Sequence, residues 1–253
     1  MARYMAGRLE QYGFTGAQVH LYGTVDELVE AVRRGEVHWI SETPYTAARL
    51  IRETGSQALV TKWKNHQPQY QSLIYTLADS GIDELNDLVG KRIAFEHPAS
   101  FSSYFLPRQI LERQGLSLVK LEHTNDPVPP GQVGYLFSRN EKNNALWVAK
   151  GIAAAGALNN GDWENRARVP ARIQAKLQVI HRSEFYPRAF EIATPALSEA
   201  AASALRDELL AMSENSHADL LARYEQTGGF SALNPKDHEF LLQLGHGRED
   251  TPE

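Results

Sequence analysis

The chain has 253 residues, with 26 Lys and Arg against 31 Asp and Glu, so its formal net charge is −5. This balance argues against general electrostatic binding of nucleic acid, and 42% hydrophobic with 23% charged residues is typical of a globular protein rather than a disordered one. The absence of Cys excludes disulfides, thiolate metal sites, iron–sulfur clusters and cysteine nucleophiles, but it suits the periplasm as well as the cytosol.

The N-terminal residues 1–10 have no apolar stretch of the kind found in a signal peptide, and no segment approaches the roughly 20 apolar residues that span a bilayer. Instead, Tyr4, Met5, Leu9 and Tyr12 fall on one face of an amphipathic helix. The chain is therefore expected to begin inside a helix.

Strand-like and helix-like segments then alternate along the chain. Thr24 and Glu27 form a capping box that predicts a helix ending before Gly35. The predicted strands cover residues 17–22, 37–41, 58–63, 70–77, 92–96, 118–122, 134–137, 153–158, 177–181 and 190–194, and the predicted helices cover 24–34, 44–53, 80–89, 102–114, 140–150, 198–212, 216–224 and 235–244. This alternation predicts an α/β fold with largely parallel sheets.

Sequence motifs for common chemistries are missing. The chain has no P-loop, no G-x-G-x-x-G, no G-x-S-x-G and no H-E-x-x-H, and its 9 His residues show no metal-ligand spacing. Glu96 and His97 form an adjacent acid–imidazole pair, but neighbours on a strand point to opposite faces. We therefore predict no metal, no cofactor and no catalytic residues.

The most informative segment is residues 87–107, in which a buried strand leads through Pro98 to a helix start that carries Ser100, Ser102 and Ser103. Free backbone N–H groups and the positive end of the helix dipole make such a place suitable for an anion. One serine could serve simply as the helix N-cap, whereas three within four residues favour ligand binding.

At this segment the chain resembles the phosphate/phosphite/phosphonate substrate-binding proteins of ABC transporters, whose pattern is roughly D-L-x-G-K-x-x-A-F followed by D-P-x-S-T-S-G-Y-x-x-P. It departs from that pattern at Phe101, where Thr is usual, and at Ser103, where Gly is usual. The matching residues are Asp87, Leu88, Gly90, Lys91, Ala94, Phe95, Pro98, Ser100, Ser102, Tyr104 and Pro107.

The resemblance extends over most of the chain, with similar segments around Trp39, Tyr45 and Tyr70 and at residues 154–162, 183–192 and 229–233. It implies a two-lobed type II periplasmic-binding-protein fold, in which each lobe is a mostly parallel sheet flanked by helices. Residues 1–75 with 186–253 would form lobe I, and residues 76–185 lobe II. Family members normally begin with an export signal and a strand before the first helix, so we expect this chain to lack the first strand.

In the resembled family the oxyanion lies between the lobes on the serine-rich helix start, and two tyrosines close over it. This implies ligand contacts for Tyr45, Tyr70, Ser100 and Ser102 and for the backbone N–H groups of Ser102 and Ser103. Phe101 would add an apolar wall. Taken alone, each tyrosine would be interpreted as a half-buried packing ring, whereas the matched segments around it favour ligand contact.

Three further positions depend on the resemblance. Glu141 replaces the family's His, Asp162 matches the acid that follows the Asn159–Asn160 pair, and Arg188 lies beside Ala189, which replaces a late Asp. Because a carboxylate only accepts hydrogen bonds, Glu141 and Asp162 would favour a protonated phosphorus oxyanion over sulfate; alternatively, both acids cap helices or face water. The resemblance also implies a ligand contact for Asn160. Because Ala189 replaces the late Asp of the family, an aminoalkyl ligand is disfavoured. Arg188 or Arg139 could instead bind the anion through its guanidinium group.

These observations predict a non-enzymatic, monomeric solute-binding protein that captures phosphonate, phosphite or phosphate by hinge closure for a membrane ABC permease. By the resemblance it would be periplasmic or lipid-anchored outside the cytoplasm, without a nucleic-acid partner. Two alternatives remain. One is a ligand-sensing module of the same fold that acts on a signalling partner. The other is an enzyme on this fold, although the sequence shows no nucleophile–base pair that would support it.

Overall fold

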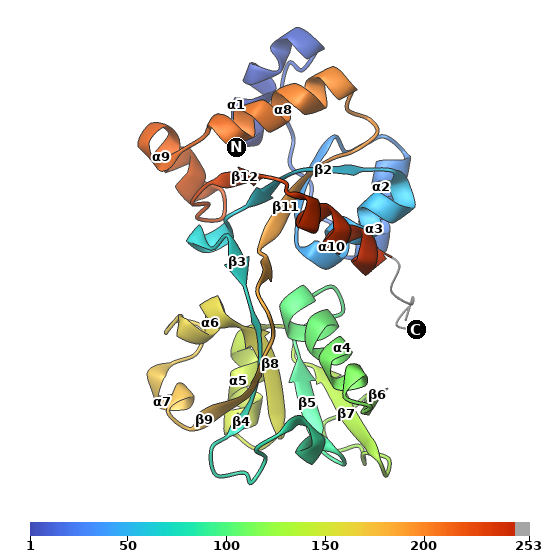
Figure 1. Cartoon of the computed structure of the whole chain (residues 1–253), viewed down its shortest axis with the longest axis vertical. Coiled ribbons are helices and arrows are strands. Elements are labelled where there is room, and N and C mark those ends of the chain that lie inside the picture. The colour runs from blue at the N-terminus through green and yellow to red at the C-terminus, as the bar shows by residue number, and fades with distance from the viewer. Residues whose placement is uncertain (246–253) are drawn as a thin grey trace. The chain divides into compact units, whose positions relative to one another are not determined.

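The computed structural model describes residues 1–245, which divide into two compact units (Figure 1). Of the described residues, unit 1 contains 1–69 and 187–245, and unit 2 contains 70–186. The chain passes from one unit to the other along β3 (Gln69–Tyr70) and β10 (Tyr186–Pro187), which pair with each other. The first expected boundary, at residues 75–76, therefore falls inside β4 (Ser72–Leu77) of unit 2.

Unit 1 begins with helix α1 (Ala2–Arg8) and a 3₁₀ turn at Glu10–Tyr12. The strand that we expected over residues 17–22 does not form: this segment has no regular structure, and Val19 and Leu21 are 77% and 96% exposed. A segment of high β-propensity becomes a strand only beside a partner, and residues 14–23 make no backbone–backbone hydrogen bond in the described chain. The first strand is instead β1 (Trp39–Glu42).

The local signals around the next two helices are confirmed. In the capping box of α2 (Val25–Arg33), the Thr24 hydroxyl accepts a hydrogen bond from the Glu27 N–H, and the Glu27 carboxylate accepts one from the Thr24 N–H. Helix α3 (Pro44–Thr54) starts with a proline and ends at Gly55, whose φ of 72° lies in the left-handed region that glycine adopts without strain.

The sheet of unit 1 has the order β1-β11-β2-β12, where β2 is Gln57–Lys62, β11 is Ala189–Ala193 and β12 is Phe230–Ala232. Its recorded pairings are all antiparallel, so the expectation of a mostly parallel sheet is wrong for this unit. Strands β1 and β2 do run in the same direction on either side of α3, as the alternation predicts, but the returning strand β11 inserts between them in the opposite direction.

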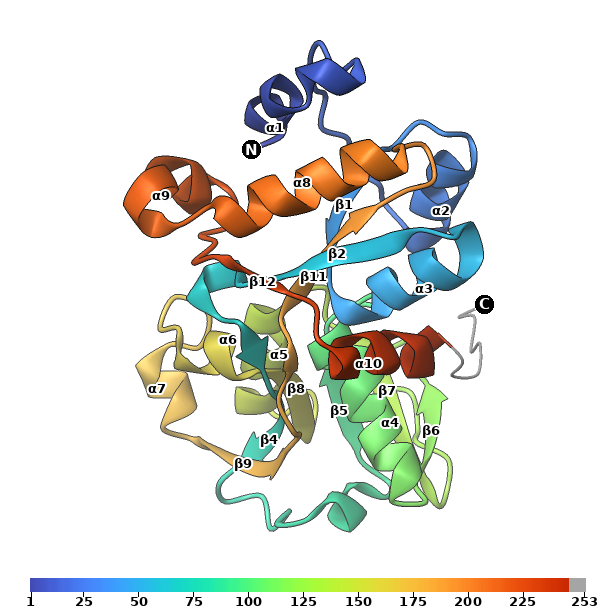
Figure 2. The same cartoon turned by 45° about the horizontal axis from the view of Figure 1, so that its top comes forward.

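Helices cover both faces of this sheet (Figure 2). On one face, α1 and α8 (Glu199–Ala211) pack with α9 (Glu214–Arg223) around Val60, Leu205 and Leu209. On the other, α2, α3 and α10 (Pro235–Gly245) pack around Phe190 and Ile192. None of the described helices is long and apolar enough to cross a bilayer.

Unit 1 also contains a buried network of charges. The side chains of Lys62 and Glu191 are both fully buried, with Nζ 3.7 Å from Oε1. Lys62 Nζ also donates to Ser41 at 2.8 Å and to Glu225 at 2.5 Å and lies over the Tyr224 ring. Glu191 accepts hydrogen bonds from Trp39 Nε1 at 2.5 Å and from the Tyr224 hydroxyl at 3.0 Å. These bonds tie β1, β2 and β11 to the end of α9.

The protonation of Glu191 makes the stability of the protein depend on pH. Burial, opposed by Lys62, raises the pKa of Glu191 from 4.5 to about 7. The native state then binds more protons than the unfolded state between these values, so stability decreases as the pH rises through this window. Between pH 5 and pH 8, the unfolding free energy of the wild type should fall by about 2 to 3 kcal/mol more than that of Glu191→Gln, as measured by urea denaturation. Parallel pH profiles of the two proteins would contradict this.

The sheet of unit 2 has the order β6-β7-β5-β8-β4-β9. Its parallel part joins β6 (Ser117–Lys120), β7 (Gln132–Phe137), β5 (Arg92–Phe95) and β8 (Ala155–Asn159), whereas β4 pairs antiparallel with β8 and with β9 (Leu177–Arg182). The mixed α/β class with a parallel-rich sheet is thus realised here.

The helices of unit 2 are α4 (Leu106–Arg113), α5 (Glu141–Ala149), α6 (Asn160–Glu164) and α7 (Ala171–Gln174). Residues 80–89, expected to be helical, contain only a 3₁₀ turn at Leu85–Leu88. One core of the unit contains Phe95, Leu111 and Val133, and another contains Leu73, Val148 and Leu158.

Candidate functional site

Three of the parallel strands of unit 2 lead into helix starts at one edge of the sheet, which we call the carboxyl edge. Strands β5, β7 and β8 end there and continue towards α4, α5 and α6, respectively. Pairing extends past the strand ends, because the Ser138 N–H donates to the Phe95 carbonyl and the Arg139 N–H to the Glu96 carbonyl, both at 2.8 Å. Polar groups that follow these strands therefore converge, as in other open α/β sheets that bind ligands at this edge.

We call residues 100–103 the serine-rich turn. It overlaps the start of a π-helical turn at Phe101–Phe105, which continues directly into α4. Ser100 is the N-cap, since its hydroxyl accepts a hydrogen bond from the Ser103 N–H at 3.2 Å. The capping interpretation therefore holds for Ser100. The Ser103 N–H, expected to bind an anion, is already engaged by this cap.

The other two serines have hydroxyls that the described chain does not use. Neither the Ser102 nor the Ser103 side chain makes a hydrogen bond to another described residue, although Ser103 is fully buried and Ser102 is 7% exposed. The backbone N–H group of Ser102 also makes no hydrogen bond to a backbone carbonyl of the described chain. A buried donor without a partner costs about 1–3 kcal/mol, so this cluster of donors at a helix start is suited to an anion.

Phe101, which replaces a Thr of the resembled pattern, is 1% exposed and lies among aromatic rings. Its ring stacks on Phe105 at 5.9 Å between centroids and contacts Tyr186 at 5.6 Å and Tyr70 at 6.1 Å. The contact with Phe101 places Tyr70, a predicted ligand residue that is 2% exposed, directly beside the serine-rich turn. The packing of Phe101 fixes the turn, while its role as a pocket wall stays a prediction.

Three carboxyl groups gather at the carboxyl edge, and we call Glu96, Glu141 and Asp162 the acid cluster. The Ser100 hydroxyl and the carboxyl groups of Glu141 and Asp162 lie near enough to Glu96 to influence its pKa, and Glu96 and Asp162 likewise influence the pKa of Glu141. Burial raises the pKa of Glu96 and, together with the charge of Glu96, that of Glu141. The structure thus brings the predicted residues Glu141 and Asp162 together beside Ser100.

The caps of α5 and α6 are other residues. Asn140 and Asn159 accept hydrogen bonds through their side chains from the N–H groups of Asn143 and Asp162, respectively, both at 2.9 Å. The amide of Asn159 also donates to the Asp162 carboxylate. Because these asparagines do the capping, the carboxylate of Glu141 is available to the acid cluster.

Glu96 is a site residue that the sequence patterns did not reveal. Its pairing with His97 was discounted because neighbours on a strand face opposite ways, but both residues follow β5, and His97 Nε2 lies 3.7 Å from Glu96 Oε2, within ion-pair distance. The available signal was the position of Glu96, directly after a buried strand and just before a helix start.

The remaining predicted residues have separate surroundings. The Asn160 side-chain carbonyl accepts a hydrogen bond from the Gln71 N–H at 2.8 Å and so anchors the segment after Tyr70. Tyr45 and Arg188 belong to unit 1, where Tyr45 follows β1 at the start of α3 and Arg188, 8% exposed, precedes β11. Since Glu42 pairs with Phe190, both residues lie at the same edge of that sheet. Their part in ligand binding stays a prediction.

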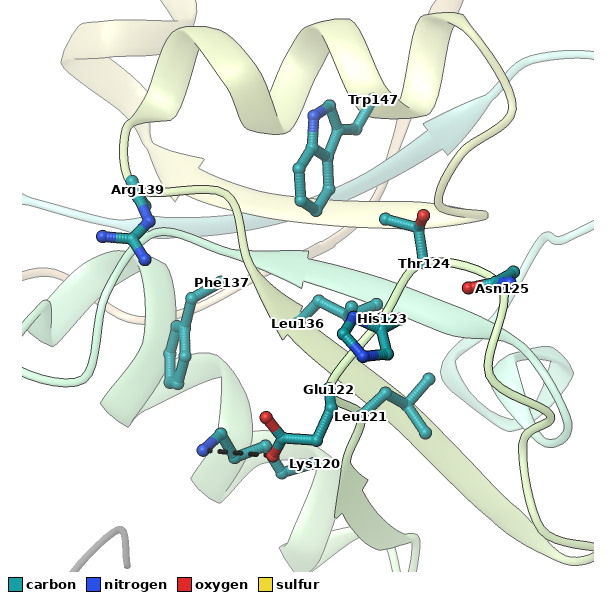
Figure 3. A pocket seen from close by; sticks show the side chains of 10 residues that line it. All are labelled: Lys120, Leu121, Glu122, His123, Thr124, Asn125, Leu136, Phe137, Arg139 and Trp147. Carbon is teal, nitrogen blue, oxygen red and sulfur yellow. Dashed lines mark ion pairs between the residues drawn. The ribbon is translucent and has the colours of Figure 1, made fainter.

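A hollow of about 570 Å³ lies elsewhere on unit 2, beyond the end of β6 (Figure 3). Trp147 and Phe137 contribute aromatic walls, and Arg139 and Lys120 contribute positive charge, with Lys120 Nζ 3.6 Å from the Glu122 carboxylate. Apart from Arg139, none of the residues predicted or considered for the site lines it.

Comparison with solved structures finds close counterparts of this fold. The chain is 29% identical to XAC2383 from Xanthomonas citri bound to chloride, with a TM-score of 0.92 over 97% of this chain and 89% of that chain. The same protein bound to ATP gives 27% identity and a TM-score of 0.91, over 97% and 90% of the two chains. PhnD1 from Prochlorococcus marinus, in complex with methylphosphonate, is 16% identical and shares the fold with a TM-score of 0.69 over 96% and 90%.

The family model described as "ABC transporter, phosphonate, periplasmic substrate-binding protein" matches residues 1–238, nearly the whole chain. The match agrees with the mixed α/β architecture and with the serine-rich helix start at the carboxyl edge. The chain therefore belongs to the periplasmic substrate-binding proteins of ABC phosphonate transporters.

Proposed function

We propose that this protein captures a small phosphorus oxyanion, namely a phosphonate, phosphite or phosphate, at the serine-rich turn of unit 2 and delivers it to an ABC permease. The observation that carries the proposal is the set of donors at that turn: the hydroxyls of Ser102 and Ser103 and the N–H group of Ser102, none of which bonds to another described residue. An oxyanion would satisfy these donors and the helix dipole together.

The family gives the coarser part of this function. Its members are substrate-binding proteins that work with permease components of ABC transporters, bind small ligands and are generally not enzymes, and the family implies a location outside the cytoplasm. We place this protein in the periplasm or on a lipid anchor, acting as a monomer without catalysis.

The proposed ligand contacts are strong enough for useful affinity. Hydrogen bonds to a charged group contribute about 1.5–3 kcal/mol each. Four or five bonds near the upper end of this range, less an association cost of several kcal/mol, leave about −8 kcal/mol, which corresponds to micromolar binding. Ser100, Ser102 and Ser103 with Tyr70 supply such contacts in unit 2, and Tyr45 and Arg188 are the proposed contributors from unit 1.

One comparison favours a wider ligand class. The relative that is 27% identical to this chain is described as bound to ATP, whose phosphoryl groups present the same oxygen chemistry as a phosphonate. A nucleotide phosphate is therefore the second candidate ligand, and it belongs in the same test.

The test is a thermal melt with 1 mM phosphate, phosphite, methylphosphonate, 2-aminoethylphosphonate, ATP or sulfate. A ligand at about 1,000 times its Kd adds roughly 4 kcal/mol to the unfolding free energy, so the Tm should rise by roughly 10 °C for a chain of this size. We expect such a shift with at least one small phosphorus oxyanion and little with sulfate. If none of the phosphorus compounds shifts the Tm, the proposed function is wrong.

A further inference from the structure

The hollow beyond the end of β6 shares no lining residue with the serine-rich turn (Figure 3). Its volume of about 570 Å³ falls within the roughly 300–1,000 Å³ of small-molecule pockets. Leu121, Leu136, Phe137 and Trp147 provide apolar and aromatic walls, and the segments after β6 and β7 provide the polar groups. Aromatic walls with a few polar groups are typical of a site that binds a small molecule.

Trp147, near the end of α5, takes no part in the cores of the protein. It is half-buried, and it belongs neither to the buried hydrophobic clusters of the described chain nor to the side chains packed against them. Its indole N–H donates no hydrogen bond to another described residue. A large ring that lines a hollow instead of a core offers a stacking surface for a planar group.

Arg139 brings positive charge to the hollow from a strained position. Its φ of 74° lies in the left-handed region, which is unfavourable for a residue with a Cβ. The turn is fixed there, because the Arg139 N–H donates to the Glu96 carbonyl at 2.8 Å and the Asn143 amide donates to the Ser138 carbonyl at 2.8 Å. Strain that the surroundings maintain in this way is concentrated at functional sites.

The guanidinium of Arg139 has no acidic partner in the part of the chain that the structure describes. The second cation of the hollow, Lys120, lies 3.6 Å from the Glu122 carboxylate. The hollow therefore presents one uncompensated positive charge, which suits a ligand with one anionic group.

The loop that forms the wall after β6 has a fixed shape. The Asp126 carboxylate accepts hydrogen bonds from the N–H groups of Glu122 and His123 at 3.0 and 2.8 Å. The loop also lies close to β7, since a Cβ at Gly134 would be 2.7 Å from Leu121 Cδ1. The polar side chains of this wall are thus held in place before any ligand binds, which lowers the cost of binding.

We propose that this hollow binds a nucleoside monophosphate, with the base on Trp147 and the phosphate on Arg139. Every base has a planar face that stacks on an aromatic ring, and a guanidinium group pairs bidentately with a phosphate. Thr124 and Asn125 lie across the hollow from Arg139 in Figure 3 and offer donors and acceptors to the edge of the base or to the ribose. A simple anion would leave Trp147 unused, and an uncharged ring would leave Arg139 unused.

The indole N–H signal of Trp147 in ¹H–¹⁵N NMR spectra reports directly on this site, and Trp147→Phe identifies it. The protein is titrated with AMP, GMP, CMP and UMP. We expect the signal to shift and saturate with at least one of them, at a Kd below about 1 mM. The signal of Trp163, which packs on Tyr75 in the same unit, should stay in place. The corresponding nucleoside and inorganic phosphate, which each carry one half of the ligand, should bind more weakly.

Three variants, measured by calorimetric titration, test the contacts. Asn adopts the left-handed region more readily than Arg, so Arg139→Asn should not lower the ligand-free Tm but should weaken nucleotide binding by about tenfold or more. Trp147→Leu keeps apolar bulk without the stacking face and should weaken it by about fivefold or more. Arg172→Asn, which removes an exposed cation of the same unit, should bind the nucleotide like the wild type.

The outcomes separate this site from the proposed function. If none of the four nucleotides moves the Trp147 signal, or if Arg139→Asn binds as tightly as the wild type, the nucleotide site is wrong and the proposed function is unaffected. Trp147→Leu should bind methylphosphonate like the wild type, and a loss there would show that the hollow is not a separate site. Failure of the wild type to bind any small phosphorus oxyanion overturns the proposed function alone.

Discussion

Replacing Lys62 by Met should lower the free energy of unfolding by about 3 to 5 kcal/mol at pH 8. The substitution removes the only cation within 4 Å of Glu191 among the described residues, and it leaves that fully buried carboxylate with neutral hydrogen-bond donors such as Trp39 and Tyr224. At pH 5 the loss should be smaller, because burial raises the pKa of Glu191 to about 7 and the group is then neutral. Urea denaturation at the two pH values measures both effects.

Two variants control this result. Lys64 also pairs with Glu225 but is partly exposed, so Lys64→Met should cost less than about 1 kcal/mol. Adding Glu191→Gln to Lys62→Met removes the uncompensated charge and should recover much of the stability, which a double-mutant cycle will show as coupling between the two positions. A loss for Lys62→Met no greater than that for Lys64→Met would show that the buried pair contributes nothing beyond surface electrostatics.

Removing the hydroxyls of Ser102 and Ser103 together should weaken the binding of methylphosphonate by about a hundredfold or more. Neither hydroxyl makes a hydrogen bond to the described chain. If the proposed function is correct, both donate to the ligand, and each of these hydrogen bonds contributes about 1.5–3 kcal/mol to binding. The fold should be little affected, because Ser100, and not these two residues, caps the helix. Calorimetric titration of Ser102→Ala/Ser103→Ala measures the loss.

Two further variants separate ligand contacts from structure. Ser117→Ala removes an exposed hydroxyl of unit 2 away from the turn and should bind like the wild type. Ser100→Ala should lose about 1 kcal/mol of stability through the cap, visible in the ligand-free Tm. If Ser102→Ala/Ser103→Ala binds methylphosphonate as tightly as the wild type does, the anion is held elsewhere.

Local features were predictable because their causes lie within one turn of chain. The capping box at Thr24 and Glu27 and the left-handed Gly55 depend on neighbours a few residues away, and the structure confirms them. The serine-rich helix start is of the same kind, since strand, Pro98 and serines follow one another directly. The sequence could not show that Ser100 caps the helix while the other two hydroxyls stay unused, because this depends on the orientation of the side chains.

The errors concern contacts between distant residues. Residues 17–22 have the composition of a strand but no neighbouring strand, so they stay irregular. Strand β11 comes from more than a hundred residues beyond β2 and makes the pairings of unit 1 antiparallel. Glu96 was not recognised because its partners, Glu141 and Asp162, follow two other strands.

By itself the sequence determined where most helices and strands lie, the mixed α/β class and the anion-suited helix start, because hydrophobic periodicity and capping act over a few residues. Only the tertiary structure decided which strands pair, which serine hydroxyls stay available and which carboxyl groups meet. Those outcomes depend on the order of strands in the sheet, which brings the ends of β5, β7 and β8 together although 64 residues separate Phe95 from Asn159. The chemistry of the site arises from that convergence.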